Sequence, residues 1–131
     1  MRQDHFTIAV VDDDPSVCRA VARLLESAGL IVKTFASAEE FLDDSDHKQT
    51  ECVLLDIFLP GMSGFDLQQQ LKTSGITIPI ILMTAYDNLS THERASALEA
   101  FDYLKKPIEA ELLVRTVIRA LEQEKPGTRD F

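Results

Sequence analysis

The sequence predicts a doubly wound α/β domain, a (βα)5 sandwich whose parallel sheet has the strand order 2-1-3-4-5. Short apolar segments alternate with longer amphipathic segments along the chain, which is typical of parallel strands joined by helices. Polar residues directly follow several of the apolar segments. The 131 residues, 45% of them hydrophobic, are enough for one domain with its own core.

Five short segments are predicted to be the strands. The first, third and fourth are almost continuously apolar, as expected of central strands that are buried on both faces. The second and fifth contain polar residues such as Lys33, Thr34 and Asp102, as expected of edge strands. With right-handed crossovers, this difference supports the order 2-1-3-4-5. The predicted strands are residues 6–11, 30–35, 52–55, 78–83 and 101–104.

The first helix is predicted to begin at Pro15, with Asp14 as its N-cap. Apolar residues recur with helical spacing from there to Ala28. Gly29 follows directly, and a glycine in this position commonly ends a helix. The chain from Asp14 to Gly29 therefore has both a start and a stop signal.

Two shorter helices are predicted next. Ser37 and Glu40 have the spacing of a capping box, which predicts a helix through Leu42. A polar loop follows it. The turn at 60–64 contains a proline and two glycines and precedes a third helix, which carries Leu67 on its apolar face.

The last two helices differ in their apolar faces. Residues 88–100 have only a thin apolar stripe, mainly Leu89, Ala95 and Leu98, so this fourth helix should pack weakly and move easily. Residues 108–121 carry a full apolar stripe and form the predicted fifth helix, which the segment at 125–127, Lys-Pro-Gly, is expected to stop.

One domain over residues 1–125 is expected, followed by a tail or linker stub over residues 126–131. The formal net charge of -9 and the pI of about 4.7 argue against direct binding to nucleic acid or to a membrane surface. No apolar segment approaches the ~20 residues of a spanning helix, and the start lacks a signal peptide, so we expect a cytoplasmic protein. Cys18 and Cys52 occupy apolar positions, which favours buried thiols over a disulfide or metal site.

Polar side chains gather at the predicted carboxyl edge of the sheet. Asp12 and Asp13 follow the first strand, Asp56 the third, Thr84 the fourth and Lys106 the fifth. In open α/β sheets ligands bind where the strand order reverses, here between the first and third strands. Three carboxylates, a hydroxyl and an ammonium suit the binding of a divalent cation and the acceptance of a phosphoryl group.

Simpler explanations exist for some of these residues taken singly. Asp14 is adequately explained as a helix cap. Thr84 alone would be a loop hydroxyl, and Lys106 with Lys105 a solvated pair. Asp56 is different, because no helix starts directly after it and an unpaired buried carboxylate is costly. A cation or a lysine must balance its charge.

Tyr103 taken alone would be an edge-strand aromatic. The three histidines, His5, His47 and His92, are isolated in polar segments and have no metal-ligand spacing, so we interpret them as surface residues.

Four motifs occur in order along the chain: VVDDD at 10–14, LLD at 54–56 with LPGMSG at 59–64, MTA at 83–85, and DYLKKP at 102–107. Together they resemble the receiver domains of two-component response regulators. The resemblance covers about residues 6–122. The segments FASAEEFL at 35–42 and MSG at 62–64 are most similar to receivers of nitrogen-fixation-type transcriptional regulators, whose output is a helix-turn-helix domain.

The resemblance implies a flavodoxin-like fold and a phosphorylation site. Asp56 would be the phosphoacceptor. Asp12 and Asp13, with Asp56, would bind Mg²⁺, and Phe58 would add its backbone carbonyl to the metal ligands. Such a domain is not an enzyme in the usual sense, because it promotes only its own phosphorylation and dephosphorylation.

Other roles follow from the same resemblance. Thr84 would hydrogen-bond a phosphoryl oxygen, and Lys106 would pair with the phosphoryl group. The peptide bond between Lys106 and Pro107 would be cis. Thr84 and Tyr103 would form the switch, which alters the face made by the fourth helix, fifth strand and fifth helix.

The implied partners are a sensor histidine kinase or phosphotransfer protein, and an output domain or partner that controls transcription. A phosphorylation-dependent homodimer is a further expectation. Two departures from the family pattern stand out. Leu59 replaces the usual methionine, a mild change. Glu99 stands where glycine is usual, which would be unfavourable if the backbone there is left-handed.

Two other functions share parts of this pattern. A flavodoxin-like cofactor binder needs a phosphate-binding loop after the first strand, where three aspartates would repel a phosphate. A haloacid-dehalogenase-type phosphatase also uses an aspartate nucleophile, but at the end of the first strand in an Asp-x-Asp-Gly-Thr-like motif. Pro15 and Ser16 occupy that place here.

Overall fold

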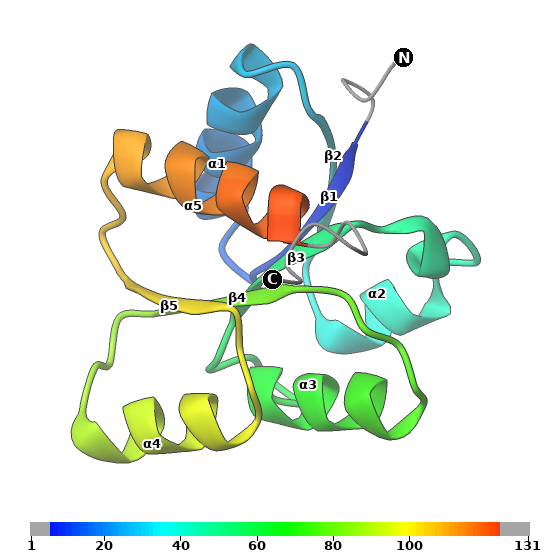
Figure 1. The fold of residues 1–131 in the computed structure, drawn as a ribbon, viewed down its shortest axis with the longest axis vertical. Coiled ribbons are helices and arrows are strands. Elements are labelled where there is room, and N and C mark those ends of the chain that lie inside the picture. The colour runs from blue at the N-terminus through cyan, green and yellow to red at the C-terminus, as the bar shows by residue number, and fades with distance from the viewer. Residues whose placement is uncertain (1–5, 124–131) are drawn as a thin grey trace, which may run out of the picture.

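The computed structural model describes residues 6–123, whose five strands form one parallel sheet of order β2-β1-β3-β4-β5 (Figure 1). All four neighbouring pairs are parallel. The predicted fold class and strand order are therefore confirmed. The strands are β1 (Thr7–Val11), β2 (Ile31–Phe35), β3 (Cys52–Asp56), β4 (Ile80–Thr84) and β5 (Asp102–Lys105).

Helices cover both faces of the sheet. Helices α1 and α5 lie on one side, and α2, α3 and α4 lie on the other (Figure 1). The predicted polar loop after α2 contains one short 3-10 helix, η2 (His47–Gln49). The bounds are α1 (Pro15–Ser27), α2 (Ala38–Asp43), α3 (Gly64–Thr73), α4 (Leu89–Ala97) and α5 (Ala110–Gln123).

The core is divided in two by the sheet. Ile8 and Val10 of β1 face α1 and α5, whereas Ala9 and Val11 face the opposite layer. This is the two-residue alternation of side chains along a strand. All residues of β3 and β4 are buried, while β2 has partly exposed residues throughout, which matches the predicted central and edge positions.

Both predicted ends of α1 are confirmed. The Asp14 carboxylate accepts a hydrogen bond from the backbone nitrogen of Ser16 at 2.9 Å, and Pro15 is the first helical residue. Beyond the helix, Gly29 has a φ of 91°, a left-handed backbone that glycine adopts without steric cost. The acidic segment before α1 is thus continuous with a firmly defined helix.

The next two helices also have side-chain caps. Ser37 accepts from the backbone nitrogen of Glu40 at 3.0 Å, but Glu40 accepts from Ala36 rather than from Ser37, so only half of the predicted capping box forms. Ser63 and Asp66 make a full capping box at the start of α3.

Helix α4 differs from its prediction in length and in its buried face. It ends at Ala97 rather than at residue 100, and Leu89, expected in the apolar stripe, is 73% exposed. The buried residues are Thr91 and Ala95. Leu89 lies two residues before Thr91, about 200° around the helix, so the two side chains cannot share a face. The thin packing expected for this helix is confirmed.

The carboxyl end of α4 is tied to α3. Glu99 follows the helix with a φ of 64°, so the left-handed position suspected from the sequence is present. Its carboxylate pairs with Lys72 at 2.9 Å, and the Gln68 side chain donates to the Leu98 carbonyl at 3.1 Å.

Three remaining expectations concern burial and the ends of the chain. Cys18 and Cys52 are buried, as predicted. Within residues 6–123, no helix combines the length and apolarity needed to cross a membrane. The expected stop of α5 at residues 125–127 and the tail at 126–131 lie outside the described residues, and the domain boundary stays a prediction.

Candidate functional site

Three carboxylates meet where β1 and β3 end. Oxygens of Asp12, Asp13 and Asp56 lie within 4.8 Å of one another. The two strands are direct neighbours in the sheet, which brings their last residues together. Asp12 and Asp56 are only 1% and 6% exposed, whereas Asp13 is open to solvent. The acids predicted from the sequence therefore form one cluster with an open side.

Local backbone contacts orient the two buried acids. The Asp12 carboxylate accepts from the backbone nitrogen of Asp14 at 2.9 Å, and the Asp56 carboxylate accepts from that of Phe58 at 3.2 Å. The Cys18 thiol of α1 donates to the Asp12 carbonyl at 3.3 Å. Each carboxylate keeps a second oxygen for other partners.

Lys106 supplies the positive charge of the cluster. Its Nζ lies 2.7 Å from Asp12 Oδ2 and 3.3 Å from Asp56 Oδ2. Its backbone nitrogen donates to the Thr84 carbonyl at 2.7 Å, and the Lys106–Pro107 peptide bond is cis, in agreement with the expectation. Burial alone would lower the pKa of Lys106, but Asp12 and Asp56 raise it above its ordinary value.

The electrostatics of the cluster favour an added cation. Burial raises the pKa of Asp56, and the charge of Asp12 raises it further, while Lys106 acts in the opposite direction. Lys106 contacts two of the three carboxylates, and its single positive charge cannot neutralise all three. A hard divalent cation prefers carboxylate oxygens together with water, so this donor set fits Mg²⁺.

Thr84 lies buried at the end of β4, beside β3. Its hydroxyl accepts from the backbone nitrogen of Tyr86 at 2.9 Å. Tyr86 in turn packs edge-to-face on Phe58, with ring centroids 5.5 Å apart. The two exposed rings join the loops after β3 and β4, a contact that the sequence patterns did not indicate.

Tyr103 connects β5 to α4. Its hydroxyl is hydrogen-bonded to the Thr91 hydroxyl, and burial raises the pKa of the phenol. Its ring stacks on His92 at a centroid distance of 4.0 Å, and His92 Nε2 lies 2.8 Å from Asp87 Oδ1. His92 is exposed, as predicted, but it is not isolated. Its contacts with Tyr103 and Asp87 do not follow from any regular spacing in the sequence.

Gly64 allows α3 to begin against the end of β3. A Cβ at this position would lie 2.3 Å from the Asp56 carbonyl oxygen and 2.8 Å from the Ile57 Cα. The backbone nitrogen of Gly64 donates to the Ile57 carbonyl at 2.8 Å. The close approach of these two backbones therefore requires glycine.

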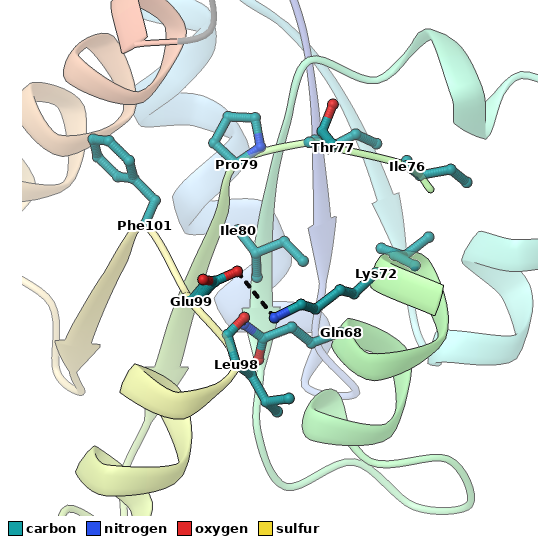
Figure 2. A pocket seen from close by; sticks show the side chains of 11 residues that line it. Gln68, Lys72, Ile76, Thr77, Pro79, Ile80, Leu98, Glu99 and Phe101 are labelled. Atoms are coloured by element: carbon teal, nitrogen blue, oxygen red, sulfur yellow. Dashed lines mark hydrogen bonds and ion pairs between the residues drawn. The ribbon is translucent and has the colours of Figure 1, made fainter. Parts of the chain in front are cut away.

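A separate cavity of about 590 Å³ lies near the start of β4, the other end of that strand from Thr84 (Figure 2). Its walls are mainly apolar, and the Lys72–Glu99 ion pair is seen in front of Ile80 (Figure 2). Gln68 lines it, but its Oε1 is buried and has no hydrogen-bond partner within residues 6–123. A second hollow, of about 540 Å³, is lined in part by Asp12 and Asp13. Because the clustered carboxylates and Lys106 lie at this end of the sheet, we place the candidate site there.

Comparisons with known proteins agree with this geometry. Residues 8–118 match the model of the response regulator receiver domain. The chain is 36% identical to the response regulator protein TmoT of Ectopseudomonas mendocina, over 95% of this chain and 58% of that protein. It is 40% identical to the DNA-binding transcriptional regulator NtrC of Klebsiella pneumoniae, over 89% of this chain and 26% of that protein.

A solved structure supports the same relation. The beryllofluoride-activated receiver domain of DrrB, from Thermotoga maritima, superposes with a TM-score of 0.83 at 33% identity, covering 90% of this chain and 98% of that one. The match thus covers nearly all of that receiver domain, but only 58% of TmoT and 26% of NtrC.

Proposed function

The chain belongs to the family of response regulator receiver domains, and from this premise we propose that it is a phosphoacceptor switch of two-component signalling in which Asp56 accepts the phosphoryl group. The observation that carries the proposal is the shared site of Asp56, Asp12 and Lys106, with both carboxylates within 3.3 Å of one ammonium. Its relatives are regulators, several of them regulators of transcription.

In this proposal an Asp56 oxygen bonds to phosphorus while the bond from phosphorus to the donor's histidine nitrogen breaks. Lys106 then pairs with the phosphoryl oxygens, and Thr84 donates its hydroxyl to one of them. Catalysis of phosphoryl transfer rests mainly on positioning and charge neutralisation, which these fixed side chains supply. The sensor histidine kinase or a phosphotransfer protein is the donor.

Asp12, Asp13 and Asp56, with the Phe58 carbonyl, would hold Mg²⁺. The bound ion neutralises charge that develops on the transferred group. The fit rests on three clustered carboxylates and on the raised pKa of Asp56, which burial and the Asp12 charge produce. Lys106 alone leaves this cluster with an excess of negative charge.

The switch would run from Thr84 to Tyr103. A phosphoryl group adds about -1.5 to -2 charge, which draws the Thr84 hydroxyl away from the backbone nitrogen of Tyr86. The loop before α4 then moves, and the Thr91–Tyr103 hydrogen bond is exchanged for another arrangement. The altered face of α4, β5 and α5 would control an output domain, or a phosphorylation-dependent homodimer.

Phosphorylation with a small donor tests the proposal. The protein is incubated with Mg²⁺ and acetyl phosphate, and intact mass is followed with time. We expect the addition of one phosphoryl group to the wild type, none to Asp56→Asn, and wild-type labelling of Asp43→Asn, which alters an exposed acid of α2. Labelling of Asp56→Asn at the wild-type rate would refute the assignment.

The metal role has its own variant. Asp13→Ala removes the exposed member of the cluster. We expect Mg²⁺ to raise the melting temperature of the wild type and to have little effect on that of Asp13→Ala. An unchanged Mg²⁺ response in the variant would exclude this site.

A further inference from the structure

Glu39 of α2 reaches across to the loop between β3 and α3. Its Oε2 accepts a hydrogen bond from the backbone nitrogen of Met62 at 3.0 Å, 23 residues along the chain. The carboxylate also fills the space beside Gly61, where a Cβ would lie 2.8 Å from Oε2. Gly61 has a φ of 75°, a left-handed backbone that also favours glycine at this position.

The other hydrogen bonds of this loop are local. Phe58 donates to Asp56, Ser63 donates to Asp66, and Gly64 donates to Ile57. Within the described part of the chain, the Glu39 bond is the hydrogen bond that ties residues 58–63 to α2, whereas Ser63 bonds to the adjoining helix α3. Burial of Leu59 in the core is a second anchor of the loop, and this one is apolar.

We propose that Glu39 is a positioning residue for the cation site: by holding the loop at Met62, it fixes the Phe58 backbone carbonyl that serves the cation beside Asp56. The proposal rests on the Mg²⁺ site of the proposed function. Glu39 itself does not touch the cation or the phosphoryl group.

The physical basis is preorganisation of the loop. Without the Glu39 carboxylate, the Met62 nitrogen turns to water, and cation binding must then order a looser loop. A single hydrogen bond has a net contribution of about 0.5–1.5 kcal/mol, which corresponds to a change of about 2-fold to 10-fold in a dissociation constant.

A charge effect is the competing explanation, because any nearby carboxylate attracts a cation. Glu39→Gln separates the two, since an amide oxygen still accepts the bond but carries no charge. Glu40→Ala is the matched control. Glu40 is next to Glu39, bonds locally to Ala36, and lines the hollow that contains Asp12 and Asp13, so a charge effect would appear there too.

Calorimetric titration of the full chain with MgCl₂ is the first test. We expect Glu39→Ala to raise the dissociation constant for Mg²⁺ by up to about 10-fold and to lower the melting temperature by only about 2–5 °C. Glu39→Gln should stay within about 2-fold of the wild type, and so should Glu40→Ala. Equal losses in Glu39→Ala and Glu39→Gln would overturn the positioning role, as would unchanged binding by Glu39→Ala.

Amide exchange without metal is the second test. Glu39→Ala should speed hydrogen exchange at the Met62 amide but not at Gly64, whose amide bonds to Ile57, and Glu39→Gln should preserve protection at Met62. Unchanged Met62 exchange in Glu39→Ala would overturn the proposal. Absence of any Mg²⁺ binding by the wild type would refute the metal site of the proposed function itself, and the positioning role with it.

Discussion

Helices α1 and α4 both begin at the acidic end of the sheet, but opposite kinds of contact hold them in place. Helix α1 buries Cys18, Val21 and Leu25 against the core. Helix α4 buries only Thr91 and Ala95. At the residue after the C-cap, α1 has a glycine with positive φ, whereas α4 has a glutamate in that conformation.

The contacts of α4 are mainly polar. They are the capping box of Asn88 with Thr91, the Thr91–Tyr103 hydroxyl pair, and the bonds that join Leu98 and Glu99 to α3. Each such bond contributes about 1 kcal/mol or less and can be exchanged for a bond to water. The apolar contacts of α1 therefore hold the neighbouring acids in place, whereas the polar contacts of α4 can rearrange at a low cost in free energy.

The largest expected effect concerns the apolar contacts of α1. Leu25→Ala should lower the free energy of unfolding by about 3 kcal/mol, because it leaves a cavity beneath α1. In α4, Ala95→Gly should cost only about 1–2 kcal/mol, from helix propensity and one buried methyl group. Urea denaturation measures both, and equal losses would contradict the comparison.

A smaller effect is expected at the amino end of α4. Thr91→Val removes the hydroxyl that bonds to Tyr103 and to the Asn88 backbone, and should cost about 1–2 kcal/mol. Hydrogen exchange should increase over residues 89–97 and stay unchanged in α1. Tyr103→Phe removes the same pair from the other side, so the double variant should lose less than the sum of the two single losses. Strict additivity would show that the pair does not hold α4.

Asp56, the acid at the end of β3, is expected to reduce the stability of the folded protein when it is ionised. Burial and the Asp12 charge raise the pKa of Asp56 above 3.8, so the folded protein binds this proton more readily than the unfolded chain does. The stabilising contribution is complete below pH 3.8 and is lost as the pH rises through the folded-state pKa. Asp56→Asn should therefore raise the melting temperature at pH 7 without Mg²⁺, by about 3 °C.

Thermal unfolding of both proteins between pH 3 and pH 8 checks this expectation. The difference should shrink as the pH falls toward the ordinary aspartate pKa. A gain that is independent of pH would mean that the substitution acts through packing rather than through charge.

The smallest expected effect is at the carboxyl end of α4. Glu99→Gly relieves a left-handed residue, worth about 1 kcal/mol, but loses an exposed ion pair and adds chain entropy to the unfolded state. The net result should be a gain of about 0.5 kcal/mol, larger in 1 M NaCl, where the lost ion pair is already screened. Denaturation at two salt concentrations measures it. A loss of stability at high salt would show that the left-handed backbone costs little here.

The strand ends and the helix caps were predictable because they depend on short-range patterns. Apolar runs locate the strands, and parallel order then brings Asp12, Asp56 and Lys106 together without knowledge of any contact. Asp14 and Gly29 follow from local capping preferences. The fold and the acidic cluster thus depend on signals that lie within a few residues of each element.

Contacts between distant segments that do not follow from the order of the parallel strands were not predictable. The hydrogen bond from the Met62 nitrogen to Glu39 joins the loop before α3 to helix α2, and no sequence periodicity relates these two segments. The buried hydroxyl of Thr91 is satisfied by a hydrogen bond with the Tyr103 hydroxyl. A pattern of hydrophobic residues cannot indicate such a polar contact. Leu89 was misplaced for the related reason that its apolar character suggested burial, although the buried face of α4 is set by Thr91 and Ala95.

The backbone packing at Gly64 has a consequence for which sequences can encode this site. A side chain there would collide with the carbonyl of Asp56 itself, so a saturation library at position 64 should return glycine alone. Gly29 and Gly75, unlike Gly64, have positive φ, but a Cβ at either meets no atom within 4 Å, so asparagine should be tolerated at both positions. Selection for folding alone would thus keep glycine next to Asp56, and invariance at position 64 would not by itself indicate a chemical role.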